Sequence, residues 1–271
     1  MKKFLIFSVL VLTAISMLLP FGVMVMVSFL PDLSMNFKDL CGNLQQLTLN
    51  NYSHVSGTIP LIKYFYNSLI VSVFTTIGQI VIASLAGYAF ARIKFRGGNI
   101  MFFIILVTMF VPSQVNIIPL FYLMRQLHLV DTYYALILPG FFGGFGVFMM
   151  RQYFLSFPKE LEEASIIDGC NRLETFFKIA FPLALPSVTT LAIFTFITSW
   201  NSFIWPLIIT NSEKMRTLPL GLAVFKESYR EVIQWGDLLA CAVVCTLPAV
   251  IIFLLGKKFI INDTMKGGIK G

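Results

Sequence analysis

The chain has 271 residues, of which 57% are hydrophobic and only 12% are charged, and its formal net charge is +7. Soluble domains carry about 25% charged residues, so a water-soluble enzyme, a disordered chain, a coiled coil and a nucleic-acid-binding domain are excluded or made improbable. The basic residues lie between apolar runs, which indicates membrane topology rather than binding to nucleic acid.

Runs that lack Asp, Glu, Lys and Arg predict six membrane-spanning helices, because about 20 apolar residues cross the hydrocarbon core. The first run follows Lys2 and Lys3 and is interpreted as a retained signal-anchor helix rather than a cleaved signal peptide. In the fifth run, Pro182 and Pro186 mark the entry, so the crossing helix is expected near 185–209. The six runs are 4–31, 64–91, 97–124, 132–150, 179–212 and 238–256.

The distribution of Lys and Arg predicts the orientation of the spans. Six spans put both termini on one side, together with the 92–96 turn and the 151–178 loop, and this side holds most of the Lys and Arg residues. By the positive-inside rule it is cytoplasmic. A count of five or seven spans would reassign these loops and weaken the asymmetry.

The four cysteines do not have the spacing of a metal cage or of a redox pair. Cys241 and Cys245 share a helix face and are interpreted as small buried residues. Cys41 and Cys170 fall in loops on opposite sides of the membrane and are not expected to pair.

No span contains a charged side chain, whereas ion-coupled transporters usually place such groups inside the bilayer. His54 and His128 lie outside the spans or at their edges and are interpreted as surface or interface residues. The chain contains no GxxxxGK[ST] loop, no GxSxG and no HExxH motif. It is therefore not expected to be an enzyme, and active transport would need energy from a separate polypeptide.

Neutral polar and aromatic side chains occur within the spans, a combination that suits a neutral, hydroxylated solute. For any one of them, the pattern favours the alternative interpretation, which is hydrogen bonding and packing between helices. These residues are Asn67, Ser68, Gln79, Ser84, Tyr88, Gln114, Asn116, Thr195, Thr198, Ser199, Trp200 and Asn201. Gly140, Gly143, Gly144 and Gly146 are expected to permit close helix approach.

The longest loop on the cytoplasmic side, 152–184, has the pattern of a helix, a break and a second helix. Pro158 suits the first turn of a helix, and Gly169 can end that helix with a positive φ. Leu161, Ala164 and Ile167 would share one face. The segment 171–180 would then return to the membrane. The simplest interpretation from this pattern alone is a solvated amphipathic connector.

The same loop resembles the EAA loop of binding-protein-dependent ABC importer permeases. That pattern reads E-A-A, three residues, G, nine residues, I-x-L-P. Glu163, Ala164, Gly169, Ile179 and Pro182 match it, while Ser165 replaces the second alanine and Phe181 the leucine. The spacing is intact.

The resemblance extends over about 62–271 and points to the carbohydrate-uptake group, in particular to its maltose-type six-span permease. It rests on Asn67-Ser68-Leu69, on Tyr88-Ala89-Phe90-Ala91-Arg92, on Trp200-Asn201-x-Phe203-x-Trp205-Pro206-Leu207 and on the tail Gly267-Gly268-Ile269-Lys270-Gly271. Residues 32–60 have no pattern that we can place.

The resemblance implies an all-α membrane protein with six transmembrane helices, the type I ABC importer permease fold and a cytoplasmic coupling-helix loop. The expected segments are 1–62, a signal anchor and extracytoplasmic part, 63–256, the permease core, and 257–271, a cytoplasmic tail. The expected partners are a second permease subunit, a homodimeric ABC ATPase and an extracytoplasmic solute-binding protein. The chain itself would need no cofactor, because ATP and Mg²⁺ would be bound by the ATPase.

Carried over residue by residue, the resemblance implies that the ATPase docks on Glu163, Ala164, Ser165, Asp168 and Gly169. The tail is expected either to reach the ATPase as well or to be a frayed basic end. Candidate pathway residues are Trp200, Asn201 and Phe203.

The expected function is import of a sugar or oligosaccharide across a bacterial or archaeal cytoplasmic membrane by alternating access. The sequence does not name the sugar, and a charged solute such as a glycerol phosphate is less favoured. The alternatives are an ion-coupled secondary transporter of a small neutral solute and a non-transporting scaffold or channel subunit.

Overall fold

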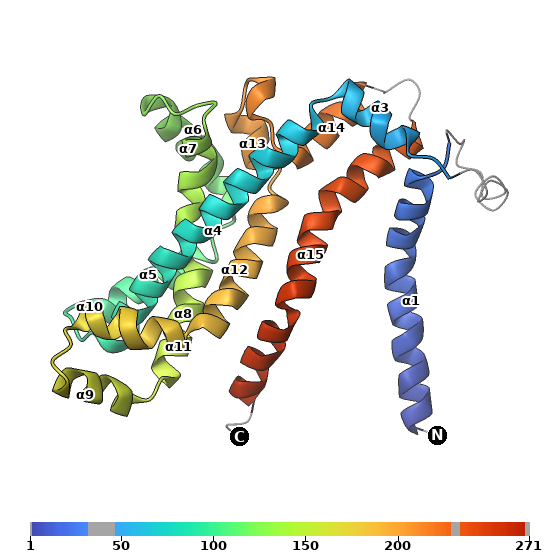
Figure 1. Ribbon diagram of the computed structural model, residues 1–271. Coiled ribbons are helices and arrows are strands. Elements are labelled where there is room, and N and C mark those ends of the chain that lie inside the picture. The colour runs from blue at the N-terminus through green and yellow to red at the C-terminus, as the bar shows by residue number, and fades with distance from the viewer. Residues whose placement is uncertain (1, 32–46, 229–233, 269–271) are drawn as a thin grey trace. The chain divides into compact units, whose positions relative to one another are not determined.

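The computed structural model describes residues 2–31, 47–228 and 234–268, and these residues are predominantly helical (Figure 1). Cys41 and the last three residues of the basic tail lie outside them. The long helices are α1 (Lys2–Ser28), α4 (Leu61–Arg92), α12 (Leu185–Trp200) and α15 (Trp235–Gly268). The shorter helices are α3 (Asn50–Thr58), α5 (Gly98–Thr108), α6 (Ile117–Gln126), α7 (Tyr133–Ile137), α8 (Gly144–Ser156), α9 (Lys159–Ile167), α10 (Arg172–Thr175), α11 (Phe181–Leu183), α13 (Ile204–Ile209) and α14 (Leu218–Ser228).

Four stretches of the described chain are long and apolar enough to cross a membrane as they stand, and two bent helix pairs bring the count to six. The four stretches are Lys3–Ser28, Leu61–Arg92, Tyr133–Ser156 and Trp235–Lys258. They coincide with the first, second, fourth and sixth apolar runs. The prediction of an all-helical membrane protein with six spans is confirmed in this form.

The third and fifth runs are not the single straight helices that the sequence predicted. Gly98–Thr108 and Ser113–Gln126 meet at 97°, because Pro112 disfavours a helical residue before it and lacks an N–H. In the fifth run α12 begins at Leu185, as expected, but it ends at Trp200 instead of near 209. A continuous helix would set the Pro206 ring against the carbonyl of residue 202, so a separate helix, α13, begins at Ile204.

By its internal contacts the chain divides into two compact units, 1–66 with 217–248 and 67–216 with 249–271. The first unit contains two helices that the sequence analysis did not expect, α3 and α14. Within it, the buried Asn51 amide donates to the carbonyls of Ser28 and Leu30 at 2.9 and 2.8 Å. The close approach of Gly236 leaves no room for a side chain there, since an added Cβ would lie 2.5 Å from the Asn51 amide nitrogen.

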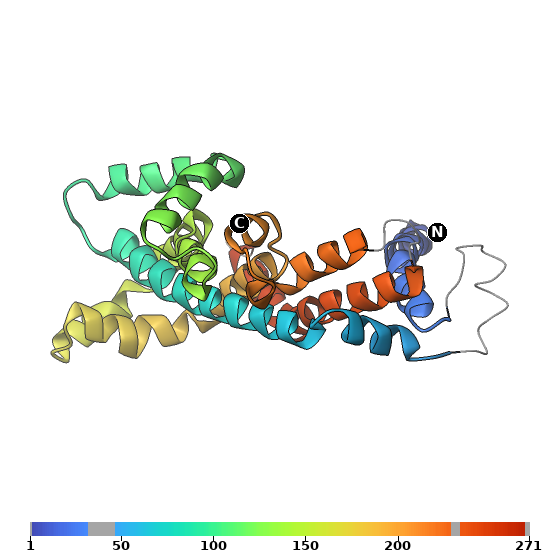
Figure 2. The same cartoon turned by 90° about the horizontal axis from the view of Figure 1, so that it is seen from above.

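In the second unit, the glycine-rich segment 140–150 packs between α4 and α5 (Figure 2). A Cβ on Gly143 would lie 2.3 Å from the Gln79 side chain of α4, and a Cβ on Gly144 would lie 3.1 Å from the carbonyl oxygen of Ile105 in α5. Contacts with α4 recur at every fourth residue of that helix, in the pairs Thr75–Gly140, Gln79–Gly143, Ala83–Gly146 and Gly87–Met150. The predicted role of these glycines in close helix approach is confirmed.

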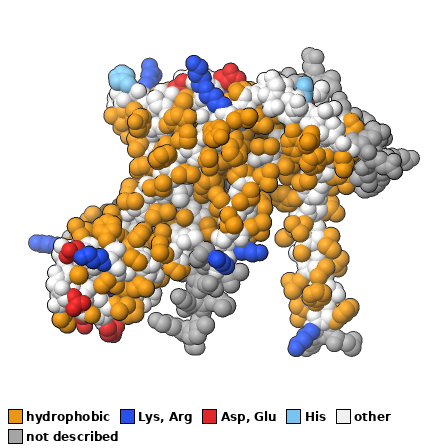
Figure 3. All heavy atoms as spheres, viewed as in Figure 1, with side chains coloured by type: hydrophobic (Ala, Val, Ile, Leu, Met, Phe, Trp, Pro, Cys, Tyr) orange, Lys and Arg blue, Asp and Glu red, His pale blue; other side chains and the backbone are white. Residues whose placement is uncertain are grey.

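Charged side chains gather at the two ends of the second unit, and hydrophobic side chains cover the helices between them (Figure 3). At one end, the Asn67 amide donates to the carbonyls of Lys214 and Arg216 at 2.9 and 2.8 Å and accepts from the Tyr133 hydroxyl at 2.6 Å. Asn67 therefore joins helices, as the packing interpretation proposed. The opposite end carries α9 and α10 (Figure 1).

Candidate functional site

The helix α9 has well-defined ends. Pro158 is its N-cap in an extended conformation, and acidic residues follow in the first turn, where the helix dipole favours them. At its end Gly169 has a φ of +85°, as the sequence predicted. The N–H of Cys170 donates to the Ser165 carbonyl at 2.9 Å and that of Gly169 to the Ile166 carbonyl at 3.0 Å. This Schellman arrangement satisfies the last carbonyls of the helix and turns the chain sharply.

After the turn, the chain returns through α10 and a π-helical turn, Phe176–Ala180. Asn171 caps α10: its side chain accepts from the N–H of Glu174 at 3.0 Å, and the Glu174 carboxylate accepts from the N–H of Asn171 at 2.9 Å. Arg172–Leu183 then meets α12 at 75°. The loop 158–184 is thus an elbow of two helical arms, which matches the predicted pattern of helix, break and helix.

A cluster of aromatic rings lies where the elbow joins the bundle. The rings of Phe154 in α8 and Phe176 in the π-helical turn lie 5.3 and 5.2 Å from the Tyr88 ring of α4, measured between centroids. All three residues belong to one buried core cluster with Ala180 and Ala184. The returning arm of the elbow is therefore packed firmly on the ends of α4 and α8.

Four of the five residues predicted to dock an ATPase are exposed on the elbow: Glu163, Ala164, Asp168 and Gly169. The fifth, Ser165, is only 2% exposed. Its hydroxyl donates to the Glu162 carbonyl at 2.7 Å and lies 2.8 Å from the Thr175 hydroxyl. Ser165 therefore links the two arms of the elbow, and its side chain is not on the surface.

The outer face of α9 is apolar as well as exposed. Leu161, Ala164 and Ile167 share this face, as predicted, and the Ile167 side chain is 85% exposed. Leu173 and Phe177 on the returning arm are exposed too. The elbow therefore presents hydrophobic side chains next to Glu163 and Asp168.

One residue that the sequence analysis gave no role, Arg92, connects α4 to α9. Its Nε lies 3.2 Å from Glu162 Oε1, and the two side chains are 7% and 17% exposed. The Arg92 guanidinium also donates to the Phe157 carbonyl. Burial raises the pKa of the Glu162 carboxyl, although the positive charges of Arg92, Arg172 and Lys159 act in the opposite direction. The sequence offers one signal for this ion pair: Arg92 and Glu162 have opposite charges and are predicted on the same side of the membrane.

The three candidate pathway residues lie at the break between α12 and α13, in different environments. Trp200 is 1% exposed and stacks on Phe196 with the ring centroids 5.7 Å apart. Asn201 and Phe203 are exposed at the break itself. The next aromatic residue, Trp205, donates from its indole N–H to the Ala135 carbonyl at 2.9 Å.

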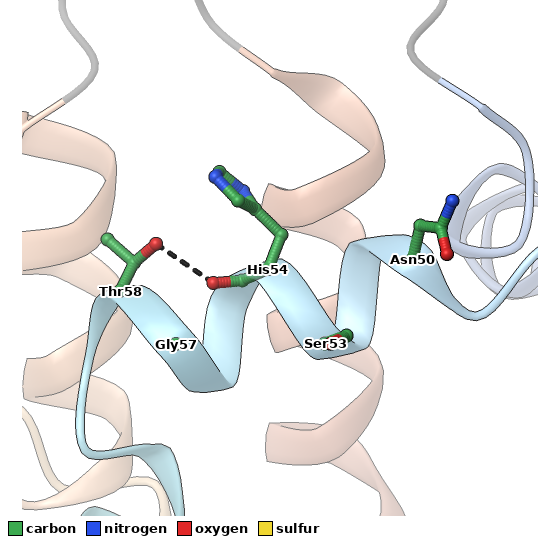
Figure 4. A pocket seen from close by; sticks show the side chains of 5 residues that line it. All are labelled: Asn50, Ser53, His54, Gly57 and Thr58. Carbon is green, nitrogen blue, oxygen red and sulfur yellow. Dashed lines mark hydrogen bonds between the residues drawn. The ribbon is translucent and has the colours of Figure 1, made fainter.

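A hollow of about 500 Å³ lies along α3 and is lined by Asn50, Ser53, His54, Gly57 and Thr58 (Figure 4). His54 Nδ1 lies 2.5 Å from Asp237 Oδ2 of α15, and the His54 side chain is half exposed. His128 is exposed. Within the described part of the chain, no three His, Cys, Asp or Glu side chains come together in a way that could hold a metal ion.

Comparison with known proteins decides the family. The sequence profile of the family described as "Binding-protein-dependent transport system inner membrane component" matches residues 79–261. The chain belongs to this family. The resemblance carried by the EAA loop is thereby confirmed, and this permease is a multi-pass component of an inner membrane.

Relatives match the permease over nearly its whole length. It is 38% identical to the arabinooligosaccharides transport system permease protein of Halalkalibacterium halodurans, over 92% of this chain and 89% of that protein. It is 34% identical to the trehalose/maltose transport system permease protein of Thermococcus litoralis, over 100% and 98%. A chain of a bacterial ABC transporter involved in the import of the acidic polysaccharide alginate has the same fold, with a TM-score of 0.81 at 23% identity over 95% of each chain.

Proposed function

We propose that this permease is one membrane subunit of an ATP-driven importer that moves a sugar or oligosaccharide into the cytoplasm by alternating access. The observation that carries the proposal is the elbow, which presents Glu163, Ala164 and Asp168 at the surface beside a glycine turn. An ABC ATPase would dock on this surface. ATP and Mg²⁺ would be bound by the ATPase, and both chain termini would lie on the same, cytoplasmic side.

The elbow is suited to transmit force because it is short and tied to the bundle. Closure of an ATPase dimer on ATP would move α9, and the returning arm would pass this movement to α12 across the 75° bend. Nucleotide would then bias the equilibrium between inward-facing and outward-facing states, through its different affinity for the two. A second permease subunit would form the other half of the pathway, and an extracytoplasmic binding protein would deliver the solute.

The substrate class rests on the relatives and on the chemistry of the spans. The names of two relatives specify arabinooligosaccharides and trehalose/maltose. The apolar runs of this chain carry no charge, which suits neutral hydroxylated solutes. We propose Asn201 and Phe203, exposed at the break between α12 and α13, as pathway residues together with Trp200.

Reconstitution tests the transport proposal. The permease would be assembled in vesicles with its second permease, its ATPase and its binding protein, and offered arabinotriose, maltotriose and trehalose. We expect uptake of at least one of these sugars. This uptake should require ATP on the side of the membrane where the ATPase is bound, and a proton uncoupler should not affect it. Proton-dependent uptake by the chain alone would instead identify an ion-coupled secondary transporter.

The docking surface is tested separately by a matched pair of charge reversals on α9. Glu163→Lys is expected to lower the amount of ATPase that co-purifies by about tenfold, the effect of losing about 1.4 kcal/mol of binding free energy. Glu160→Lys reverses a charge that is also exposed but lies outside the EAA pattern, and it should change co-purification little. Equal retention of the ATPase by both variants would contradict the assignment of the docking surface.

A further inference from the structure

The helix α9 has few contacts of its own that could fix its direction. At its start it follows a short extended link, Phe157–Pro158, and at its end it meets the turn at Gly169. Its apolar side chains Leu161, Ile166 and Ile167 are exposed, so burial of apolar surface within this chain contributes little. Polar contacts must therefore set its orientation.

Two polar contacts can set the orientation of α9, and they connect it to different helices. The Ser165–Thr175 hydrogen bond leads to α10, which belongs to the same elbow. The Arg92–Glu162 ion pair leads to the last residue of α4, a helix of 32 residues that spans the membrane. Of these two contacts, the ion pair is the one that ties α9 directly to a span.

The geometry of Arg92 suits a rigid link. Its guanidinium donates a hydrogen bond to the Phe157 carbonyl directly before α9, and its Nε lies 3.2 Å from Glu162 Oε1 in the first turn, an ion pair without a hydrogen bond between these two atoms. The guanidinium carbon also lies 5.8 Å from the centroid of the Phe157 ring. The hydrogen bond to the Phe157 carbonyl fixes the direction of the planar guanidinium, and burial reduces the screening of the Arg92–Glu162 pair by water.

We propose that Arg92 and Glu162 are positioning residues that form a strut between α4 and the elbow, so that movement of α9 is passed to the span rather than lost by bending of the elbow. This inference rests on the proposed function. Buried ion pairs contribute little to net stability, because desolvation offsets their attraction. The strut therefore determines the orientation of α9 and the coupling of transport to ATP, and Glu163 beside it contacts the ATPase.

The chain offers a matched control in Arg151. This arginine lies at the same end of the bundle, donates to the Phe90 carbonyl of α4 at 3.3 Å and lies over the Phe102 ring at 4.0 Å. These contacts do not involve α9. Replacing Arg151, a residue of α8, thus removes an arginine that contacts the end of α4 without touching the strut.

The orientation of α9 is measured first. Spin labels are placed at Lys94→Cys and Ile167→Cys, two exposed positions, in a chain whose native cysteines are replaced by serine and which is assembled with the second permease and the ATPase. The distribution of distances between the labels is recorded without nucleotide and with ATP. We expect a narrow distribution in both states for the parent chain and for Arg151→Gln, and a clearly broader one for Arg92→Gln and Glu162→Gln.

Coupling is measured on the same variants as arabinotriose transported per ATP hydrolysed, or maltotriose if the parent importer takes up only that sugar. Arg92→Gln and Glu162→Gln are expected to lower this ratio by about fivefold, within the range seen for residues that couple two sites, while the ATPase still co-purifies. The double substitution to glutamine should be no worse than either single one. The reversed pair, Arg92→Glu with Glu162→Arg, should narrow the distance distribution again, which a general loss of folding would not do.

Unchanged distance distributions in both single variants, or an equal broadening in Arg151→Gln, would overturn the strut. Failure of the proposed function has a different signature, because the parent chain itself would then fail to bind an ATPase or to transport. In that case the label distances in the two-permease complex would still decide whether Arg92 and Glu162 fix α9.

Discussion

The hydroxyl groups of Ser165 and Thr175 lie 2.8 Å apart, and this buried hydrogen bond joins the two arms of the elbow. Ser165 occupies the second small-residue position of the EAA pattern, so the sequence alone indicates a contact with the partner. Its burial indicates an internal role instead. A side chain within the EAA pattern can thus hold α9 in place instead of contacting a partner.

This role predicts a particular phenotype for Ser165→Ala. Losing one buried hydrogen bond costs about 1 kcal/mol, which corresponds to about 2–4 °C in the melting temperature of a chain of this size. The ATPase should still co-purify. Ser156→Ala is the control, because Ser156 makes the same kind of bond to the carbonyl three residues earlier but is exposed. Loss of the ATPase without a change in melting temperature would show instead that Ser165 contacts the ATPase.

Two glycines allow backbone strain to be separated from docking. Gly169 and Gly97 both have a φ of +85°, and a Cβ added to either would have no heavy atom within 4 Å. Alanine should therefore cost about 1–2 kcal/mol at each position through backbone strain alone. We expect similar losses of thermal stability, measured by aggregation on heating, but a loss of uptake of about tenfold only for Gly169→Ala, since that strain unwinds the end of α9. Equal effects on uptake would show that the turn at Gly169 has no special part in coupling.

Much of this architecture could be predicted from the sequence, because the physical signals are local. Apolar runs without charge predict the spans. Pro186 predicts the start of α12, and Gly169 predicts the end of α9. The bends at Pro112 and before Pro206 were harder, since a proline in an apolar run permits either a kink or a break. The helix α3 has few apolar residues at helical spacing, so its existence depends on contacts with other elements. The helix α14 contains Pro219 and Gly221, which are typical of a turn.

In the candidate site, too, features with local signals could be predicted from the sequence and features that depend on packing could not. The exposed residues of the elbow follow from the EAA spacing, whereas the burial of Ser165 depends on how the two arms of the elbow fold against each other. Arg92 and Glu162 are 70 residues apart in the sequence. Positive-inside topology places them on one side of the membrane, but only the packing of α4 against the elbow brings their charges within 3.2 Å.

Substitution of Asn67 tests whether a polar side chain in a span packs between helices or lines the transport pathway. It is 1% exposed, and its amide satisfies two backbone carbonyls and the Tyr133 hydroxyl. Asn67→Ala should lower the free energy of unfolding by about 2–3 kcal/mol, because several buried polar groups lose their partner, and Tyr133→Phe by only about 1 kcal/mol. Gln114→Ala, at an exposed position, should be nearly neutral. Thermal melting in detergent measures this order. A change in sugar preference with unchanged melting for Asn67→Ala would favour a pathway role.

Burial of Glu162 predicts a pH dependence that distinguishes stability from orientation. Burial raises the pKa of its carboxyl above the ordinary 4.5, despite attraction by Arg92, Arg172 and Lys159. A raised pKa means that the folded state favours the protonated form, so the stabilisation from this group is fully present below pH 4.5 and is lost as the pH rises through the raised value. The melting temperature of the parent chain relative to Glu162→Gln should therefore fall as the pH is raised from 4.5 to 7.

The orientation of α9 should respond in the opposite sense, because the ion pair exists only while Glu162 is ionised. The label distances between positions 94 and 167 should be narrow at pH 7.5 and should broaden on acidification before the pH reaches 4.5, whereas Glu162→Gln should be broad throughout. The exposed Glu174 does not produce this transition, since a backbone hydrogen bond from Asn171 and the neighbouring Lys178 hold the pKa of its carboxyl below the ordinary value. A distribution in the parent chain that stays narrow down to pH 4.5 would show that the charge of Glu162 does not orient the elbow.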